Sequence, residues 1–218
     1  SVNQARRHWA GAFQATLVHA IVAALAITAH RISGQKSLIF HKVAHGRETC
    51  IPDMDVSRTV GWFITHTPIT VRLESALTDK GLSPAQALSS VSEQYRAIPD
   101  NGLGHSALRY FSDDPRAKEL ARHDQVKTLF QYIGDVWEDN YDGSLFLPPD
   151  PALMDLPDTV AAQNLADYHL HVYAYLMDGC FRMKFFYTRP NYRPDTILTM
   201  AGLFSDAIKS MLLGPGES

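Results

Sequence analysis

The sequence predicts an α/β fold, an α+β sandwich in which a mixed, largely antiparallel sheet is flanked by helices. Apolar residues recur at helical spacing near both ends of the chain, whereas shorter segments between them alternate as strands do. Two apolar and aromatic runs, Tyr168–Met177 and Cys180–Thr188, flank an Asp-Gly pair, which is typical of an antiparallel hairpin. No glycine-rich phosphate-binding motif follows a predicted strand, so a nucleotide-binding fold is disfavoured.

In the first half of the chain, the elements follow from apolar spacing. Apolar residues three or four apart predict a buried helix over residues 11–31, which should end near Gly34 because glycine favours the left-handed closing turn. Alternation in Ser37–Val43 predicts a strand, so the next polar residues should lie at or just past its end. A serine cap followed by a proline predicts a helix over Ser83–Ala97.

The second half begins with a glycine-rich loop, which we predict over Pro99–Ser106. Val126–Ile133 alternates β-branched and aromatic residues, which predicts a strand that precedes the hairpin. Four prolines place a surface loop at Pro148–Pro157. Apolar residues on one helical face predict a closing amphipathic helix over Pro194–Leu213.

Composition is that of an ordinary globular protein and excludes several classes of function. The 218 residues are 45% hydrophobic and carry a net charge of −3, so no basic field attracts nucleic acid. Cys50 and Cys180 lack disulfide-framework or zinc-ligand spacing, which favours a reducing, cytoplasmic setting. The longest apolar stretch, Ala15–Thr28, is interrupted by His19 and is too short to span a bilayer. We therefore expect no nucleic-acid partner and no membrane.

Two neighbouring segments carry the residue types that proton transfer requires. His45-Gly46-Arg47-Glu48 puts an ionisable carboxylate beside a fixed cation on a glycine-containing turn. Ten residues after the glutamate, Arg58–Phe63 begins and adds a tryptophan and a phenylalanine. A carboxylate that takes up and returns a proton needs a tuned charge environment and shielding from water. The spacing therefore indicates a site.

These segments are two of four blocks that resemble, in order, motifs of the epimerization domains of non-ribosomal peptide synthetases. Those domains belong to the condensation-domain superfamily. His45–Glu48 resembles the end of an EGHGRE block, and Arg58–Pro68 resembles RTVGWFTxxYP. Pro99–Ser106 resembles PxxGxGYG, and Phe130–Gly134 resembles FNYLG with glutamine in place of asparagine. The resemblance covers nearly the whole chain and concerns the C-terminal half of such a domain.

The resemblance implies that residues 1–218 form a single lobe, like the C-terminal subdomain of a condensation or epimerization domain, with a chloramphenicol acetyltransferase-like fold. Such domains have two lobes, and the first carries an HHxxxDG block that this sequence lacks. The nearest pattern, His169-x-His171, has the wrong spacing, and without a third ligand it predicts no metal site. The chain is then one lobe that pairs with a companion N-terminal lobe, or a single-lobed relative that self-associates.

The family reaction inverts the α-carbon of an aminoacyl or peptidyl thioester, which a carrier protein presents on its 4′-phosphopantetheine arm. The resemblance implies no permanently bound cofactor. Removing the α-proton requires a base on one face, an acid on the other and donors for the enolate oxygen. By resemblance Glu48 is the acid/base of this lobe, and Tyr132 and His45 are further catalytic candidates. The candidate substrate-binding residues are Arg47, Arg58, Trp62, Phe63, Gly102, Gly104 and Gln131.

The charged candidates also have structural interpretations. Glu48 can form a loop salt bridge with Arg47 or Arg58 instead of lying in a cleft. If residues 47 and 48 both lie on a strand, their side chains point to opposite faces, so we expect Arg47 to brace the loop. For His45 a structural hydrogen bond near a tight turn is favoured over a catalytic role.

The aromatic and glycine candidates likewise have both a functional and a structural interpretation. Trp62 and Phe63 either line the wall between lobes or belong to a core. Tyr132 either donates a hydrogen bond to the enolate or carboxylate, or is a strand tyrosine with a wet hydroxyl. Gln131 should point to the face opposite Tyr132, so only one of them can enter a cleft. The glycine-rich loop either brings backbone amides to the pantetheine or is simply a turn.

Three functions therefore compete. The first is epimerization from L to D by the C-terminal lobe of an epimerization domain, with Glu48 as acid/base. The second is a stand-alone enzyme of specialised metabolism, an isomerase or cyclase that rebuilds a cleft by self-association. The third is a non-catalytic module that docks a carrier protein or the companion lobe. The four blocks favour the first.

Overall fold

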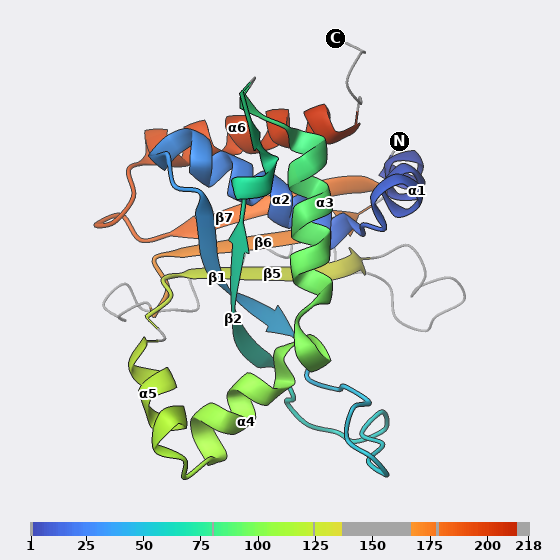
Figure 1. Cartoon of the computed structure of the whole chain (residues 1–218), viewed down its shortest axis with the longest axis vertical. Coiled ribbons are helices and arrows are strands. Elements are labelled where there is room, and N and C mark those ends of the chain that lie inside the picture. Colours follow the sequence, from blue (N-terminus) through green and yellow to red (C-terminus); the bar gives the residue numbers. More distant parts are fainter. Residues whose placement is uncertain (1, 80, 124, 137–166, 178, 213–218) are drawn as a thin grey trace, which may run out of the picture.

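The computed structural model describes residues 2–79, 81–123, 125–136, 167–177 and 179–212. Within them a five-stranded sheet has the order β2-β1-β5-β6-β7 (Figure 1). These strands are β1 (Ser37–Ala44), β2 (Thr65–Arg72), β5 (Thr128–Val136), β6 (Leu170–Met177) and β7 (Cys180–Tyr187). The pairs β1–β2 and β6–β7 are antiparallel, whereas β1–β5 and β5–β6 are parallel. The predicted fold class is confirmed, with parallel and antiparallel pairs in more even balance than expected.

The helix predicted over residues 11–31 is wrong in its first part. The chain instead forms α1 (Val2–Phe13) and α2 (Leu17–Ser33), which meet at an angle of 85°. The helix is interrupted at Gln14, whose φ of 48° is left-handed. Thr16 then caps α2. The predicted end is confirmed, because Gly34 closes α2 with a φ of 72°.

The core lies between one face of the sheet and the helices α2, α3 (Pro84–Arg96) and α6 (Pro194–Leu212), as Figure 1 shows. Residues 20–27 of α2 are at most 8% exposed, because the sheet and the neighbouring helices surround them. The predictions for α3 and α6 are confirmed, including the Ser83 cap. Among the described residues no single helix is long and apolar enough to cross a membrane, although the bent pair α1–α2 meets that criterion by length and composition.

Several shorter elements depart from the predictions. The edge strand β2 was not predicted, because Pro68 interrupts its alternation; an edge strand tolerates proline. The loop predicted over Pro99–Ser106 is wrong, since these residues form η2 (Pro99–Gly102) and the start of α4 (Leu103–Phe111). The remaining elements are η1 (Glu74–Ala76), β3 (Leu77–Thr78), β4 (Gly81–Leu82) and α5 (Pro115–His123).

The later predictions fare better. The strand predicted over Val126–Ile133 exists as β5, displaced by two or three residues. The hairpin is confirmed as β6 and β7, which pair in continuous register. The surface loop predicted at Pro148–Pro157 lies outside the described residues.

The sheet order brings distant segments to one place. Strand β1 runs parallel to β5, with His41 opposite Leu129 and Lys42 opposite Phe130. The segment after β1 therefore lies next to the second half of β5, although about 85 residues separate them along the chain. The predicted position of the HGRE segment just past a strand end is confirmed.

Candidate functional site

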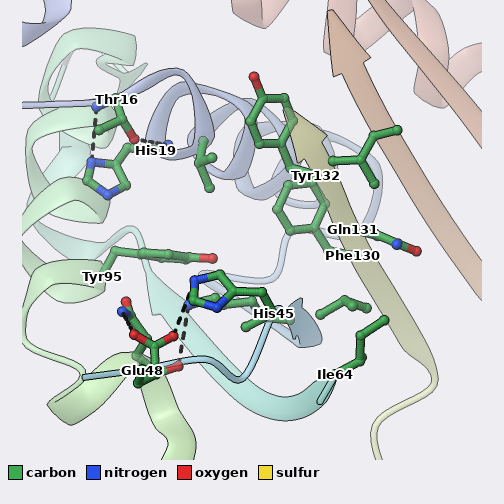
Figure 2. A pocket seen from close by; sticks show the side chains of 15 residues that line it. Thr16, His19, His45, Glu48, Ile64, Tyr95, Phe130, Gln131 and Tyr132 are labelled. Atoms are coloured by element: carbon green, nitrogen blue, oxygen red, sulfur yellow. Dashed lines mark hydrogen bonds and ion pairs between the residues drawn. The ribbon is translucent and has the colours of Figure 1, made fainter. Parts of the chain in front are cut away.

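A cavity of about 550 Å³ opens beside the C-terminal end of β1. The segment after β1 and strand β5 face it from opposite sides, and the start of α2 and the last turn of α3 complete its wall (Figure 2). Its polar lining residues include His19, Lys42, Glu48, Tyr95 and Asn101. Segments far apart in the sequence therefore supply one cavity.

Glu48 lies in the wall of this cavity and not on the open surface. Its side chain is only 13% exposed. One carboxylate oxygen accepts a hydrogen bond of 2.8 Å from the Asn101 side-chain amide, and the other lies 3.6 Å from Nε2 of His45. In the part of the chain that the structure describes, no salt bridge joins Glu48 to Arg47 or Arg58. The cleft interpretation of Glu48 therefore fits the geometry.

His45 holds the glutamate from the solvent side. Its side chain is 67% exposed, and its Nδ1 accepts a hydrogen bond of 2.9 Å from the Arg47 backbone N–H. An accepting Nδ1 places the proton of the neutral ring on Nε2, which is the nitrogen that faces Glu48. His45 thus makes the structural hydrogen bond that was favoured, while its Nε2 lies beside the carboxylate but beyond hydrogen-bond distance.

Gly46 and Arg47 fix the shape of this segment. Gly46 has a φ of 64°, and a Cβ there would lie 1.8 Å from the carbonyl oxygen of Phe63. The Arg47 guanidinium donates hydrogen bonds to the carbonyls of Val56 and Gly61 and lies 4.2 Å from the Phe63 ring centroid. Arg47 therefore braces the loop, as expected, and it does not line the cavity.

Lys42 and Tyr95 are cavity residues that the sequence analysis missed. Nζ of Lys42 donates to the backbone carbonyl of Asn101 at 3.3 Å and lies 5.2 Å from the Tyr95 ring centroid. Burial lowers the pKa of Lys42, and the Glu48 carboxylate partly offsets this effect. A signal was present: Lys42 follows the buried Phe40 by two residues, so strand alternation turns a lysine inward.

His19 completes the polar wall without adding charge. Its Nδ1 accepts from the backbone N–H of Thr16, and Thr16 in turn caps the His19 N–H. Burial, and then the nearby Arg96 and Lys42, lower the pKa of His19 from 6.5 to about 4. The imidazole is therefore neutral at pH 7.

Comparison with known proteins identifies the family. The model of the condensation-domain family matches residues 1–218. The chain belongs to the condensation-domain family. It is 28% identical to bacitracin synthase 3 of Bacillus licheniformis over 196 residues, which are 88% of this chain and 3% of that protein. It is 30% identical to surfactin synthase subunit 1 of Bacillus subtilis (strain 168) over 182 residues, 83% of this chain and 5% of that protein.

The condensation-domain fold is also found among solved structures. The epimerization domain of the third module of tyrocidine synthetase B is similar, with a TM-score of 0.78 and 24% sequence identity. The match covers 97% of this chain and 46% of that one. This condensation-domain chain therefore spans less than half of the solved domain and a few per cent of the synthases.

Two aromatic candidates of the family blocks do not line the cavity of this condensation-domain chain. Neither Trp62 nor Phe63 lines the cavity, and their expected place in a wall between two lobes stays a prediction. Trp62 is 87% exposed, and the Arg47 guanidinium packs against the ring of Phe63. Arg58 is exposed and does not line the cavity either.

The β5 candidates border the cavity from the far side. Figure 2 shows the side chains of Gln131 and Tyr132 pointing in different directions, as strand alternation predicts. The prediction that only one of them can enter a cleft is wrong, because both residues line the cavity. The phenol oxygen of Tyr132 points away from Glu48 (Figure 2), so direct orientation of the carboxylate by Tyr132 is not what the geometry offers.

The glycine candidates have structural tasks. Gly102 has a φ of 90°, and a Cβ there would lie 2.3 Å from Thr67, whose hydroxyl donates to the Gly102 carbonyl. Gly104 lies in the first turn of α4. These residues are folded into η2 and α4 instead of a loop, and an approach of their backbone amides to the pantetheine stays a prediction.

Proposed function

We propose that the chain is the C-terminal lobe of a two-lobed epimerization domain. Its substrate is an aminoacyl or peptidyl thioester that a carrier protein presents on 4′-phosphopantetheine, and Glu48 moves the α-proton. The observation that carries the proposal is the position of Glu48: a carboxylate 13% exposed in a cavity, hydrogen-bonded by Asn101 and flanked by His45. The order of the four sequence blocks supports the same assignment.

The geometry suits Glu48 to proton transfer. Asn101 donates a hydrogen bond to one carboxylate oxygen, which orients the carboxylate without neutralising it, and Nε2 of His45 lies 3.6 Å from the other oxygen. A cavity of about 550 Å³ is large enough for the end of a pantetheine arm and an amino-acid side chain. Glu48 takes the α-proton on one face, and the companion lobe supplies the acid on the opposite face.

Peptide-bond formation is the second candidate, because the family model that matches residues 1–218 is that of condensation domains. The two reactions differ at the α-carbon. Condensation leaves its C–H bond intact, whereas epimerization breaks and remakes that bond. Configuration at the α-carbon therefore separates the two functions.

The test uses the chain together with its companion lobe and a carrier protein loaded with an L-aminoacyl group. After hydrolysis, chiral chromatography measures the fraction of D-amino acid. We expect conversion by the wild type and a loss of at least about 100-fold in the Glu48→Gln variant, since general acid–base catalysis contributes 10²–10⁴. Glu74→Gln, at an exposed site on η1, is the matched control. Undiminished conversion by Glu48→Gln would refute the proposal.

A further inference from the structure

Strand β1 places a charged side chain, that of Lys42, on its inward face. Lys42 shares this face with the fully buried Phe40, and burial lowers its pKa. Placing an ammonium there costs solvation free energy that a neutral side chain would not lose. The hydrogen bond to the Asn101 carbonyl and the Tyr95 ring recover part of that cost.

Tyr95 presents an unused hydrogen-bond donor beside this cation. Its hydroxyl is buried and has no hydrogen-bond partner among the described residues. Figure 2 shows the hydroxyl pointing toward the interior of the cavity. Burial raises the pKa of the phenol well above its usual range, so the hydroxyl keeps its proton. A buried polar group without a partner is rare, and an oxygen atom of a bound ligand would satisfy it.

Asn101 contacts both the Lys42 ammonium and the Glu48 carboxylate. Its backbone carbonyl accepts from Lys42, and its side-chain amide donates to Glu48. One residue of η2 therefore holds an ammonium and a carboxylate on the same side of the cavity. Tyr132 and the backbone of Gly102, the hydrogen-bond donors predicted from the sequence, do not supply a donor beside Glu48. Tyr132 points away from Glu48, and Gly102 is covered by Thr67.

We propose that Nζ of Lys42 and the hydroxyl of Tyr95 bind the thioester oxygen of the substrate and stabilise it as an enolate. This inference rests on the proposed function and names the oxygen-binding subsite of the same cavity. Donors that are fixed before reaction and shielded from water stabilise developing negative charge most effectively.

The step balances with the groups present. The α-C–H bond breaks, its proton moves to Glu48, and its electron pair forms the carbon–carbon double bond as the carbonyl π pair moves onto oxygen. Negative charge therefore passes from the carboxylate to the enolate oxygen while the Lys42 ammonium stays beside both. Return of a proton to the opposite face restores the carbonyl, and Glu48 then releases its proton to solvent.

The test compares Lys42→Met, Lys42→Arg and Tyr95→Phe in α-deuterium exchange on a carrier-bound aminoacyl thioester, with the companion lobe supplied. We expect Lys42→Met to lower kcat by about 100-fold with little change in KM, because the interaction acts on the intermediate. Tyr95→Phe should lower kcat by about tenfold. Lys42→Arg should restore most of the activity. Lys36→Met, at an exposed site before β1, is the matched control.

A pH profile separates this role from a structural one. In the wild type kcat should fall at alkaline pH as Lys42 loses its proton, below the pH at which an ordinary lysine titrates. The Lys42→Met variant should lack that alkaline fall. A Lys42→Met variant with wild-type kcat, or one whose kcat still falls at alkaline pH, would overturn the inference. If Glu48→Gln is inactive in the same assay, the proposed function still stands. Exchange that survives in Glu48→Gln would overturn both.

Discussion

At the scale of single residues, the site depends on which groups carry charge. Glu48 and Lys42 are the charged pair, and Asn101 connects them. His19 lies in the same wall but is kept neutral by burial, which lowers its pKa to about 4. The cavity therefore has one cation close to one carboxylate, and its electrostatics at neutral pH follow from that pair.

His19 makes stability depend on pH in a predictable direction. Between pH 6.5 and about 4 the unfolded chain binds a proton at this imidazole and the folded chain does not. The free energy of unfolding should therefore fall as pH is lowered through this window, by roughly 3 kcal/mol at most from this residue.

The His19→Gln variant isolates that contribution, because glutamine can still accept the N–H of Thr16 and does not titrate. Urea unfolding at pH 7 and pH 4.5 should show a smaller stability loss for the variant than for the wild type. Identical losses would show that His19 is not buried neutral.

The sequence was sufficient to single out Glu48, since its motif is local and lies after a clear strand. It was not sufficient to find Tyr95 and Asn101. Their contacts with Lys42 and Glu48 cross 53 and 59 residues of sequence and depend on how α3 and η2 approach β1. Such contacts follow from tertiary packing, which no local pattern encodes.

At the scale of elements, strongly periodic segments were predicted correctly and short irregular ones were not. The Ser83 cap and the following proline defined α3 within a residue. The break at Gln14 was missed because apolar spacing continues through it. The glycines of the η2 segment predict a loop, but the structure places Asp100 and Asn101, as well as Gly102, in the left-handed region of a short helix.

Gly46 is the position in the segment His45–Glu48 that is least tolerant of a side chain. Its left-handed φ and the carbonyl of Phe63 leave no space for a Cβ. Gly46→Ala should therefore lower the free energy of unfolding by at least about 2 kcal/mol, or displace the loop. Denaturant unfolding measures the first effect.

Gly104→Ala is the matched control, because a Cβ at this helical site meets nothing within 4 Å. Alanine is the better helix former, so this variant should be neutral or up to about 1 kcal/mol more stable. Equal stabilities of the two variants would contradict the close packing of Gly46 against residue 63.

At the scale of the whole molecule, we propose that the chain is one lobe whose site a companion lobe completes. It matches 46% of a solved epimerization domain, and Val60 and Trp62 are 100% and 87% exposed. Exposed large apolar side chains that lie close together are typical of a surface that a partner covers. A contact of Trp62 with the companion lobe remains a prediction.

Fluorescence tests that contact. Adding the companion lobe should shift the emission of the wild type to shorter wavelength, because Trp62 passes from water into an interface, whereas Trp9 is already buried. The Trp62→Phe variant should still bind the companion lobe but show a much smaller shift. An equal shift in the variant would place Trp62 outside the interface.

Deuterium incorporation at the α-carbon tests the central claim most directly. The two-lobed protein is incubated in D₂O with a carrier-bound aminoacyl thioester, and mass spectrometry follows the released amino acid. The account predicts rapid α-deuteration by the wild type and none above background by Glu48→Gln. Peptide-bond formation without α-deuteration, or α-deuteration that persists without the Glu48 carboxylate, would contradict it.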